Sequence, residues 1–132
     1  MNRFVILSIL ISFTLFSFGQ DCPVVDSAFL IKKAKKTIIK TNRKFYKNPP
    51  ELNIAWENYK ITCGKSIDCY NKKFDFYFVS FIDSEGHFAN VIFEYKSKRK
   101  LILLDCHFTI STPQEILDSI KQDPESYWGC NV

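Results

Sequence analysis

The chain has 132 residues, of which 46% are hydrophobic and 16% aromatic, and its formal net charge is +4 at neutral pH. This length favours one domain that can bury a real core, and it leaves little room for a second domain. So modest a net charge does not identify a partner, although the cations are unevenly distributed along the chain.

The first nineteen residues have the pattern of an export signal. Arg3 precedes an uncharged, largely apolar run, and the small residues Ser17 and Gly19 stand where a signal peptidase requires them. We therefore expect residues 1–19 to be a signal peptide and residues 20–132 to be a single exported α+β domain, secreted or periplasmic after cleavage. An uncleaved anchor is the alternative, for which the run is short. We expect no transmembrane segment in the mature chain.

Residues 27–41 predict an amphipathic helix that Asp26 and Ser27 can cap. The outer face of this helix is basic, with Lys32, Lys33, Lys35, Lys36 and Lys40. Between Ser27 and Pro50 the chain carries seven lysines, one arginine and no acid, a local charge of +8. This face is either an ordinary solvated surface or a binding surface for an anionic membrane or an acidic protein. A nucleic-acid partner is not expected.

The segment from Glu51 to Ile61 is ambiguous. Its apolar residues fit a short helix after Pro49 and Pro50, which is the interpretation we favour, but its end also fits a strand reaching Cys63. Residues 64–72 are expected to form a loop.

The next part of the chain predicts an antiparallel meander of three or more strands. Its three clear strands are Phe74 to Asp83, Phe88 to Lys96, and Leu101 to Thr109. Residues 84–86 suit a three-residue hairpin loop with glycine in the left-handed conformation. The turns then pair Ser80 with Asn90, Asn90 with His107, and Lys96 with Leu101.

This register predicts one almost wholly apolar face, which carries Val79, Val91 and Cys106, and a second face with polar residues among aromatic ones. Thr112 and Pro113 begin a second helix that ends at Asp123 and Pro124, and the aromatic tail is expected to pack back. We expect both helices on one face of the sheet, in a cystatin-like or related helix-on-sheet layout. That analogy concerns architecture alone.

Five cysteines follow the leader, so at least one thiol has no partner within the chain. Cys106 is expected to be a buried free thiol. Among the three possible pairings of the other four we prefer Cys63 with Cys69 and Cys22 with Cys130. Their spacing, and only two histidines, give no expectation of a metal site or a cofactor.

The polar row of the second face is the candidate ligand-binding site, and it comprises Ser80, Asn90, His107, Asp105, Phe76 and Phe78. Polar groups within an aromatic surface are typical of small-molecule pockets. The predicted function is an exported, non-catalytic module that binds a protein or a small apolar ligand through the open sheet face or the basic helix. The alternatives are a small hydrolase using Ser80, His107 and Asp105, and an envelope-associated protein held by its basic helix.

Overall fold

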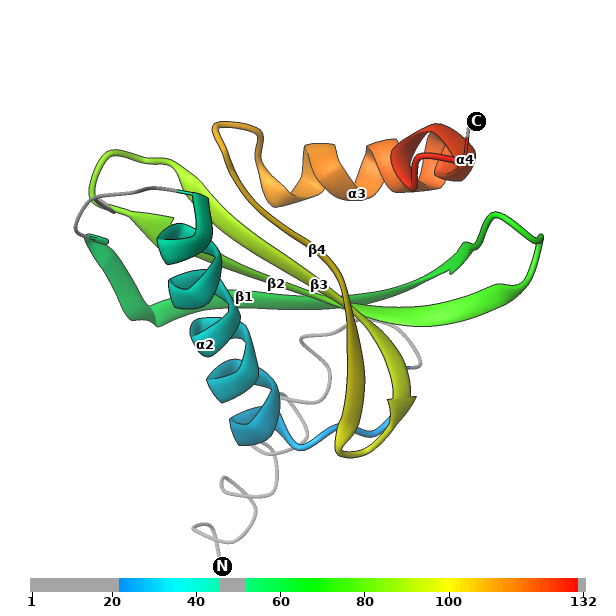
Figure 1. Ribbon diagram of the computed structural model, residues 1–132, viewed down its shortest axis with the longest axis horizontal. Coiled ribbons are helices and arrows are strands. Elements are labelled where there is room, and N and C mark those ends of the chain that lie inside the picture. The colour runs from blue at the N-terminus through cyan, green and yellow to red at the C-terminus, as the bar shows by residue number, and fades with distance from the viewer. Residues whose placement is uncertain (1–21, 46–51, 131–132) are drawn as a thin grey trace, which may run out of the picture.

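The structure, a computed structural model, describes residues 22–45 and 52–130 (Figure 1). The expected signal peptide lies outside the described residues. The elements follow in the order α2 (Ser27–Phe45), β1 (Ile54–Ile67), β2 (Lys73–Asp83), β3 (Phe88–Ser97), β4 (Lys100–Thr109), α3 (Pro113–Gln122) and α4 (Pro124–Tyr127). The four strands form one antiparallel sheet in the order β1-β2-β3-β4. The described chain therefore has an α+β layout.

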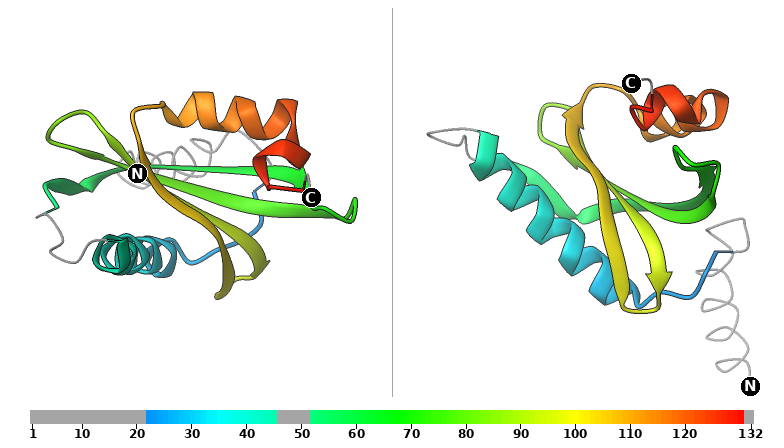
Figure 2. Two further views of the ribbon diagram at one scale, coloured as in Figure 1. Left: turned by 45° about the horizontal axis from the view of Figure 1, so that its top comes forward. Right: turned by 45° about the vertical axis from the view of Figure 1, so that its right-hand side comes forward.

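The helices lie on opposite faces of the sheet, so the expectation that both pack on one face is wrong. Figure 2 shows α2 on one side of the strands and α3 on the other. The reason lies in β2, where Val79 and Phe81 face α2 while Phe76 and Phe78 face α3 and its buried Ile120. Two faces that each carry buried phenylalanines must both be removed from water.

Strand β1 replaces the helix expected over residues 51–61 and the first part of the loop expected over 64–72. Within the described residues the expected helix is therefore wrong, and the loop is confirmed only over residues 68–72, between β1 and β2. The strand alternative was the correct one, because the free edge of β2 pairs with β1 from Tyr59 to Ile67. Gly64 allows this pairing: a Cβ atom there would lie 2.6 Å from Cζ of the buried Phe76 ring.

The expected register is confirmed in the first hairpin, where Ser80 pairs with Asn90, and at Asn90 opposite His107. Strand β4 then departs from it, because the register shifts between Ile92 and Phe93. Leu101 consequently pairs with Tyr95 instead of Lys96 and joins the α2-side core, while Leu104 packs on the α3 side. A bulge of this kind reverses the facing of every residue on one side of it.

The two disulfides are Cys22–Cys63 and Cys69–Cys130, so the expected pairing of the same four cysteines is wrong. The cause is the length of β1, which continues to Ile67. The four residues that follow Cys63, up to Ile67, run away from it in extended conformation over roughly 13 Å, which carries the following turn too far away for a bridge between Cys63 and Cys69. Cys106 is free and half-buried.

Both ends of the described chain are fastened to the sheet. The Tyr77 hydroxyl donates a hydrogen bond to the Pro23 carbonyl, and burial, followed by the charges of Tyr95 and Asp75, raises the pKa of Tyr77 to about 12. At the other end Trp128 Nε1 donates to Ser66 Oγ at 2.9 Å. The expectation that the aromatic tail packs back is confirmed.

Candidate functional site

The polar row predicted as a ligand site is in the interior of the protein. Ser80 is 3% exposed and Asn90 is fully buried. The Ser80 hydroxyl donates to Asn90 Oδ1 at 2.6 Å, and Phe76 and Phe78 are buried in the cluster that also contains Ile120 of α3. The sheet face that was expected to be open is therefore covered by α3 and α4.

Asp105 and His107 lie at the exposed end of this row. His107 Nδ1 is 2.8 Å from Asp105 Oδ2, and the Tyr127 hydroxyl of α4 donates to the same oxygen at 3.2 Å. Burial raises the pKa of Asp105, but hydrogen bonds from His107 and Tyr127 and the charge of His107 outweigh it, so the pKa falls below its usual value. Burial and the neighbouring carboxylate raise the pKa of Tyr127.

This geometry gives no support to the hydrolase alternative. A serine nucleophile needs a base that accepts its proton, whereas the proton of Ser80 goes to Asn90 Oδ1. Among the described side chains, Asn90 Nδ2 is the one buried polar atom without a hydrogen-bond partner. Ser80 and Asn90 therefore pair with each other in the interior, and Asn90 Nδ2 is left as an unsatisfied donor.

We expect the Asp105 contacts to stabilise the fold in a pH-dependent way. Because the pKa of Asp105 is lowered by folding, its contribution is present above the unfolded-state pKa and is lost as pH falls through the folded-state pKa. Asp105→Asn should therefore destabilise the protein at about pH 6 and have a much smaller effect at about pH 2.5. Urea denaturation at both pH values measures this, with the exposed Asp118→Asn as control. If Asp105→Asn lowers the free energy of unfolding equally at both pH values, the proposed role of the ionised Asp105 carboxylate is contradicted.

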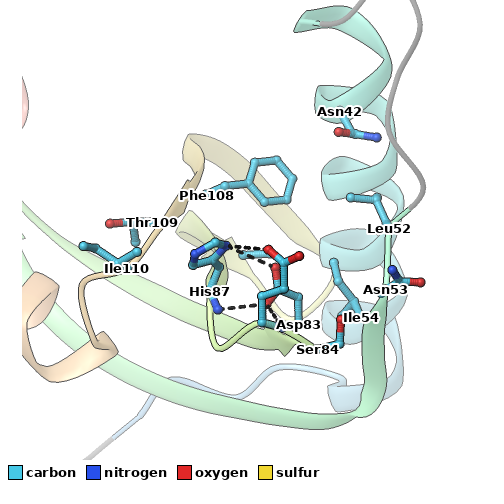
Figure 3. A pocket seen from close by; sticks show the side chains of 12 residues that line it. Asn42, Leu52, Asn53, Ile54, Asp83, Ser84, His87, Phe108, Thr109 and Ile110 are labelled. Carbon is cyan, nitrogen blue, oxygen red and sulfur yellow. Dashed lines mark hydrogen bonds and ion pairs between the residues drawn. The ribbon is translucent and has the colours of Figure 1, made fainter.

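A pocket of about 590 Å³ lies elsewhere, between the end of α2, the start of β1, the β2–β3 turn and the end of β4 (Figure 3). Its lining residues are Asn42, Leu52, Asn53, Ile54, Asp83, Ser84, Glu85, His87, Ala89, Phe108, Thr109 and Ile110. This volume is within the range of small-molecule sites.

The β2–β3 turn positions the polar side of the pocket. Asp83 Oδ1 accepts the backbone N–H groups of Glu85 and His87, each at 2.8 Å. The Ser84 N–H donates to the Asn53 carbonyl at 2.9 Å and so fastens the turn to the start of β1. Gly86, with φ of 83°, supplies the left-handed residue that the expected hairpin loop requires.

The other carboxylate oxygen of Asp83, Oδ2, is directed toward the side chains of the pocket. Asp83 Oδ2 is 3.6 Å from His87 Nδ1, and Glu85 Oε2 is 3.8 Å from the same nitrogen. In Figure 3 the apolar side chains of Leu52 and Ile54 lie across from His87. The pocket thus combines an apolar wall with an acidic rim, and none of the described residues that line it is a lysine or arginine.

None of the six residues predicted for the ligand site lines this pocket. The sequence did place Asp83 and His87 together at a turn, since that pairing follows from the hairpin loop. It gave no signal for Asn42 or Leu52, because these come from α2 and from the segment just before β1 and meet the turn only in the folded chain.

The basic residues of α2 are exposed as expected, with the exception of Lys33, which is half-buried. Its ammonium lies 5.6 Å from the centroid of the Phe29 ring. Cys106 is on the α2 side of the sheet, and burial raises the pKa of its thiol. Within residues 22–45 and 52–130, no three histidine, cysteine or acidic side chains are grouped closely enough to bind a metal ion. No helix in that part of the chain has the length and hydropathy needed to cross a bilayer.

Fold and site together define a small, disulfide-bonded α+β domain with helices on both faces of the sheet and one acid-rimmed pocket among its described residues. Comparisons of the chain with protein-family models, curated proteins and solved structures found no match. Functional inference therefore depends on the geometry of the site.

Proposed function

We propose that this protein is an exported, non-catalytic binding module whose pocket takes a small amphiphilic ligand with an apolar body and a cationic head. The observation that carries the proposal is the pocket itself, about 590 Å³ with an apolar wall and two carboxylates at its rim. The buried polar row is not chosen, because α3 and α4 cover it.

The apolar part of the ligand is inferred from the wall. Leu52 and Ile54 are half-buried, while Phe108 is 41% and Ile110 is 77% exposed. An apolar ligand would remove part of this surface from water, at about 25 cal/mol per Å². Exposed apolar side chains that converge on a concavity are typical of binding sites.

The cationic head is inferred from Asp83 and Glu85. With histidine neutral, these two side chains give the lining a formal charge of −2. The Asp83 oxygen nearest His87 is 3.6 Å from that ring, beyond normal hydrogen-bond length, so it can accept a hydrogen bond from a ligand. An ammonium group at this rim would gain charge-assisted hydrogen bonds.

Export is part of the same proposal. It is supported by the leader pattern of residues 1–19 and by the two disulfides, which form and persist in oxidising compartments. The absence of a base for the Ser80 hydroxyl favours binding over catalysis.

Calorimetric titration with decylamine, decanol and decanoate tests this assignment. We expect decylamine to bind most tightly and decanoate least, because the three probes share an apolar body and differ in head charge. Asp83→Asn with Glu85→Gln should weaken decylamine binding at least about tenfold and leave decanol binding nearly unchanged. Asparagine can still accept the two turn hydrogen bonds, so the loop is retained.

The matched control is Asp118→Asn with Glu125→Gln, which removes the same charge from the exposed α3 and α4 surface. It should bind decylamine as the wild type does. Equal loss in both variants would show a response to net charge alone, and equal affinity for decylamine and decanoate would contradict the proposed head group.

A further inference from the structure

The exposed cations of α2 continue onto the turn between β3 and β4. The Asp26 N–H at the start of the helix donates to the Lys98 carbonyl at 3.4 Å. The Arg99 guanidinium carbon lies 5.7 Å from the centroid of the Phe29 ring, which Lys33 also approaches. Figures 1 and 2 show this turn beside the first turns of α2. The α2 basic surface comprises Lys32, Lys33, Lys35, Lys36, Lys40, Arg43, Lys44, Lys98, Arg99 and Lys100.

These cations have no anionic partner within the described chain. No ion pair between described residues involves any member of the surface. Lys32, Lys36, Lys40 and Lys44 follow one another at four-residue spacing, at which like charges repel across a helix. The lysines therefore repel one another along the whole helix. An external anionic surface would relieve this repulsion, because its negative charge would neutralise theirs.

The chemistry of α2 favours lipid headgroups over a protein partner. Protein interfaces are built around exposed aromatic and apolar anchors and are poor in lysine. Among the α2 side chains from Ser27 to Lys44, whose exposure the structure describes, none is an exposed large hydrophobic one. Lysine is a compact charge on a flexible stem, suited to a diffuse anionic field. The nineteen residues of α2 present it over roughly 28 Å.

The opposite side of the molecule has the opposite charge. α3, α4 and the capping residue between them carry Glu115, Asp118, Asp123 and Glu125 against Lys121, a formal charge of −3. An anionic bilayer would therefore attract the α2 side and repel the α3 side, which orients the domain as well as binding it.

We propose that the α2 basic surface holds the exported protein against an anionic phospholipid bilayer. This binding is electrostatic and peripheral, because the apolar stripe of α2 is used in the core and is not available for insertion. It is independent of the pocket, so failure of either proposal leaves the other standing.

Sedimentation of the mature protein with vesicles of phosphatidylglycerol and phosphatidylcholine tests the proposal. We expect binding at low salt that is absent with pure phosphatidylcholine and is lost at about 1 M salt, where the Debye length is about 3 Å. The triple variant Lys32→Glu, Lys36→Glu and Arg43→Glu should bind at least about tenfold more weakly. All three side chains are exposed, and circular dichroism verifies that the fold is retained.

The matched control places the same charge change elsewhere, in Lys72→Glu, Lys73→Glu and Lys121→Glu, which are also exposed. Retained vesicle binding in this control supports the proposal, whereas a loss equal to that of the α2 variant overturns it in favour of net charge. Binding to pure phosphatidylcholine also overturns it. So does a preference for a DNA oligonucleotide or an acidic protein over the vesicles at the same salt concentration.

Discussion

Replacing Cys69 and Cys130 with serine is expected to lower the free energy of unfolding by about 4 kcal/mol. The bridge spans a sequence separation of 61 residues, so its loss gives the unfolded chain much more freedom. It also releases the tail that carries the contact between Trp128 and Ser66. Urea denaturation under non-reducing conditions measures the loss. For a domain of ordinary stability, a loss of this size is a large part of the total free energy of unfolding.

The control is Cys106→Ser, which leaves both bridges intact. It should shift the urea midpoint far less, because serine is of similar size and Cys106 is half-buried. Intact-mass measurement after alkylation should find one reactive thiol in the unfolded wild type and none in this control. A double serine variant as stable as the wild type would show that the bridge does not constrain the chain.

The substitution Phe78→Ala is expected to cost about 3 to 5 kcal/mol of unfolding free energy. The Phe78 ring is completely buried in the cluster that joins β2 and β3 to Ile120 of α3. Its removal leaves a cavity between the sheet and α3 that the surrounding backbone cannot fully close. Thermal or urea denaturation measures the effect.

Leu103→Ala serves as the matched apolar truncation, since Leu103 is 47% exposed on β4. We expect it to cost less than about 1 kcal/mol, because little buried surface is lost. A mild effect of Phe78→Ala, similar to that of Leu103→Ala, would mean that the α3 face of the sheet is open to solvent. The buried row of Ser80 and Asn90 would then return as a candidate ligand site.

The pairing and facing of the strands could be predicted from the sequence where they depend on a turn and on the alternation of nearby residues. The loop at Gly86 determines which residues of β2 and β3 face one another, and alternation of apolar residues then assigns their faces. The same reasoning placed Asp105 beside His107 and Ser80 beside Asn90. It failed in the first half of β4, because the bulge at Leu104 leaves no mark that sequence periodicity can detect.

The residues of the pocket could not be predicted in the same way. His87 was recognisable as a turn residue, but its role depends on Asn42 and Leu52, which approach from distant parts of the chain. The length of β1 was equally undetermined, since its residues also fit a short helix until an edge of β2 is present to pair with them.

By itself the sequence determined the amphipathic basic helix, the three-stranded meander and the free thiol at Cys106, because each depends on neighbouring residues or on composition; the signal peptide over residues 1–19 stays a prediction. Only the tertiary structure decided the side of the sheet that each helix covers, the partners of Cys63 and Cys69, and the position of the pocket. These depend on which distant surfaces meet, and several arrangements satisfy the same local pattern. Packing of two apolar sheet faces selects one of them.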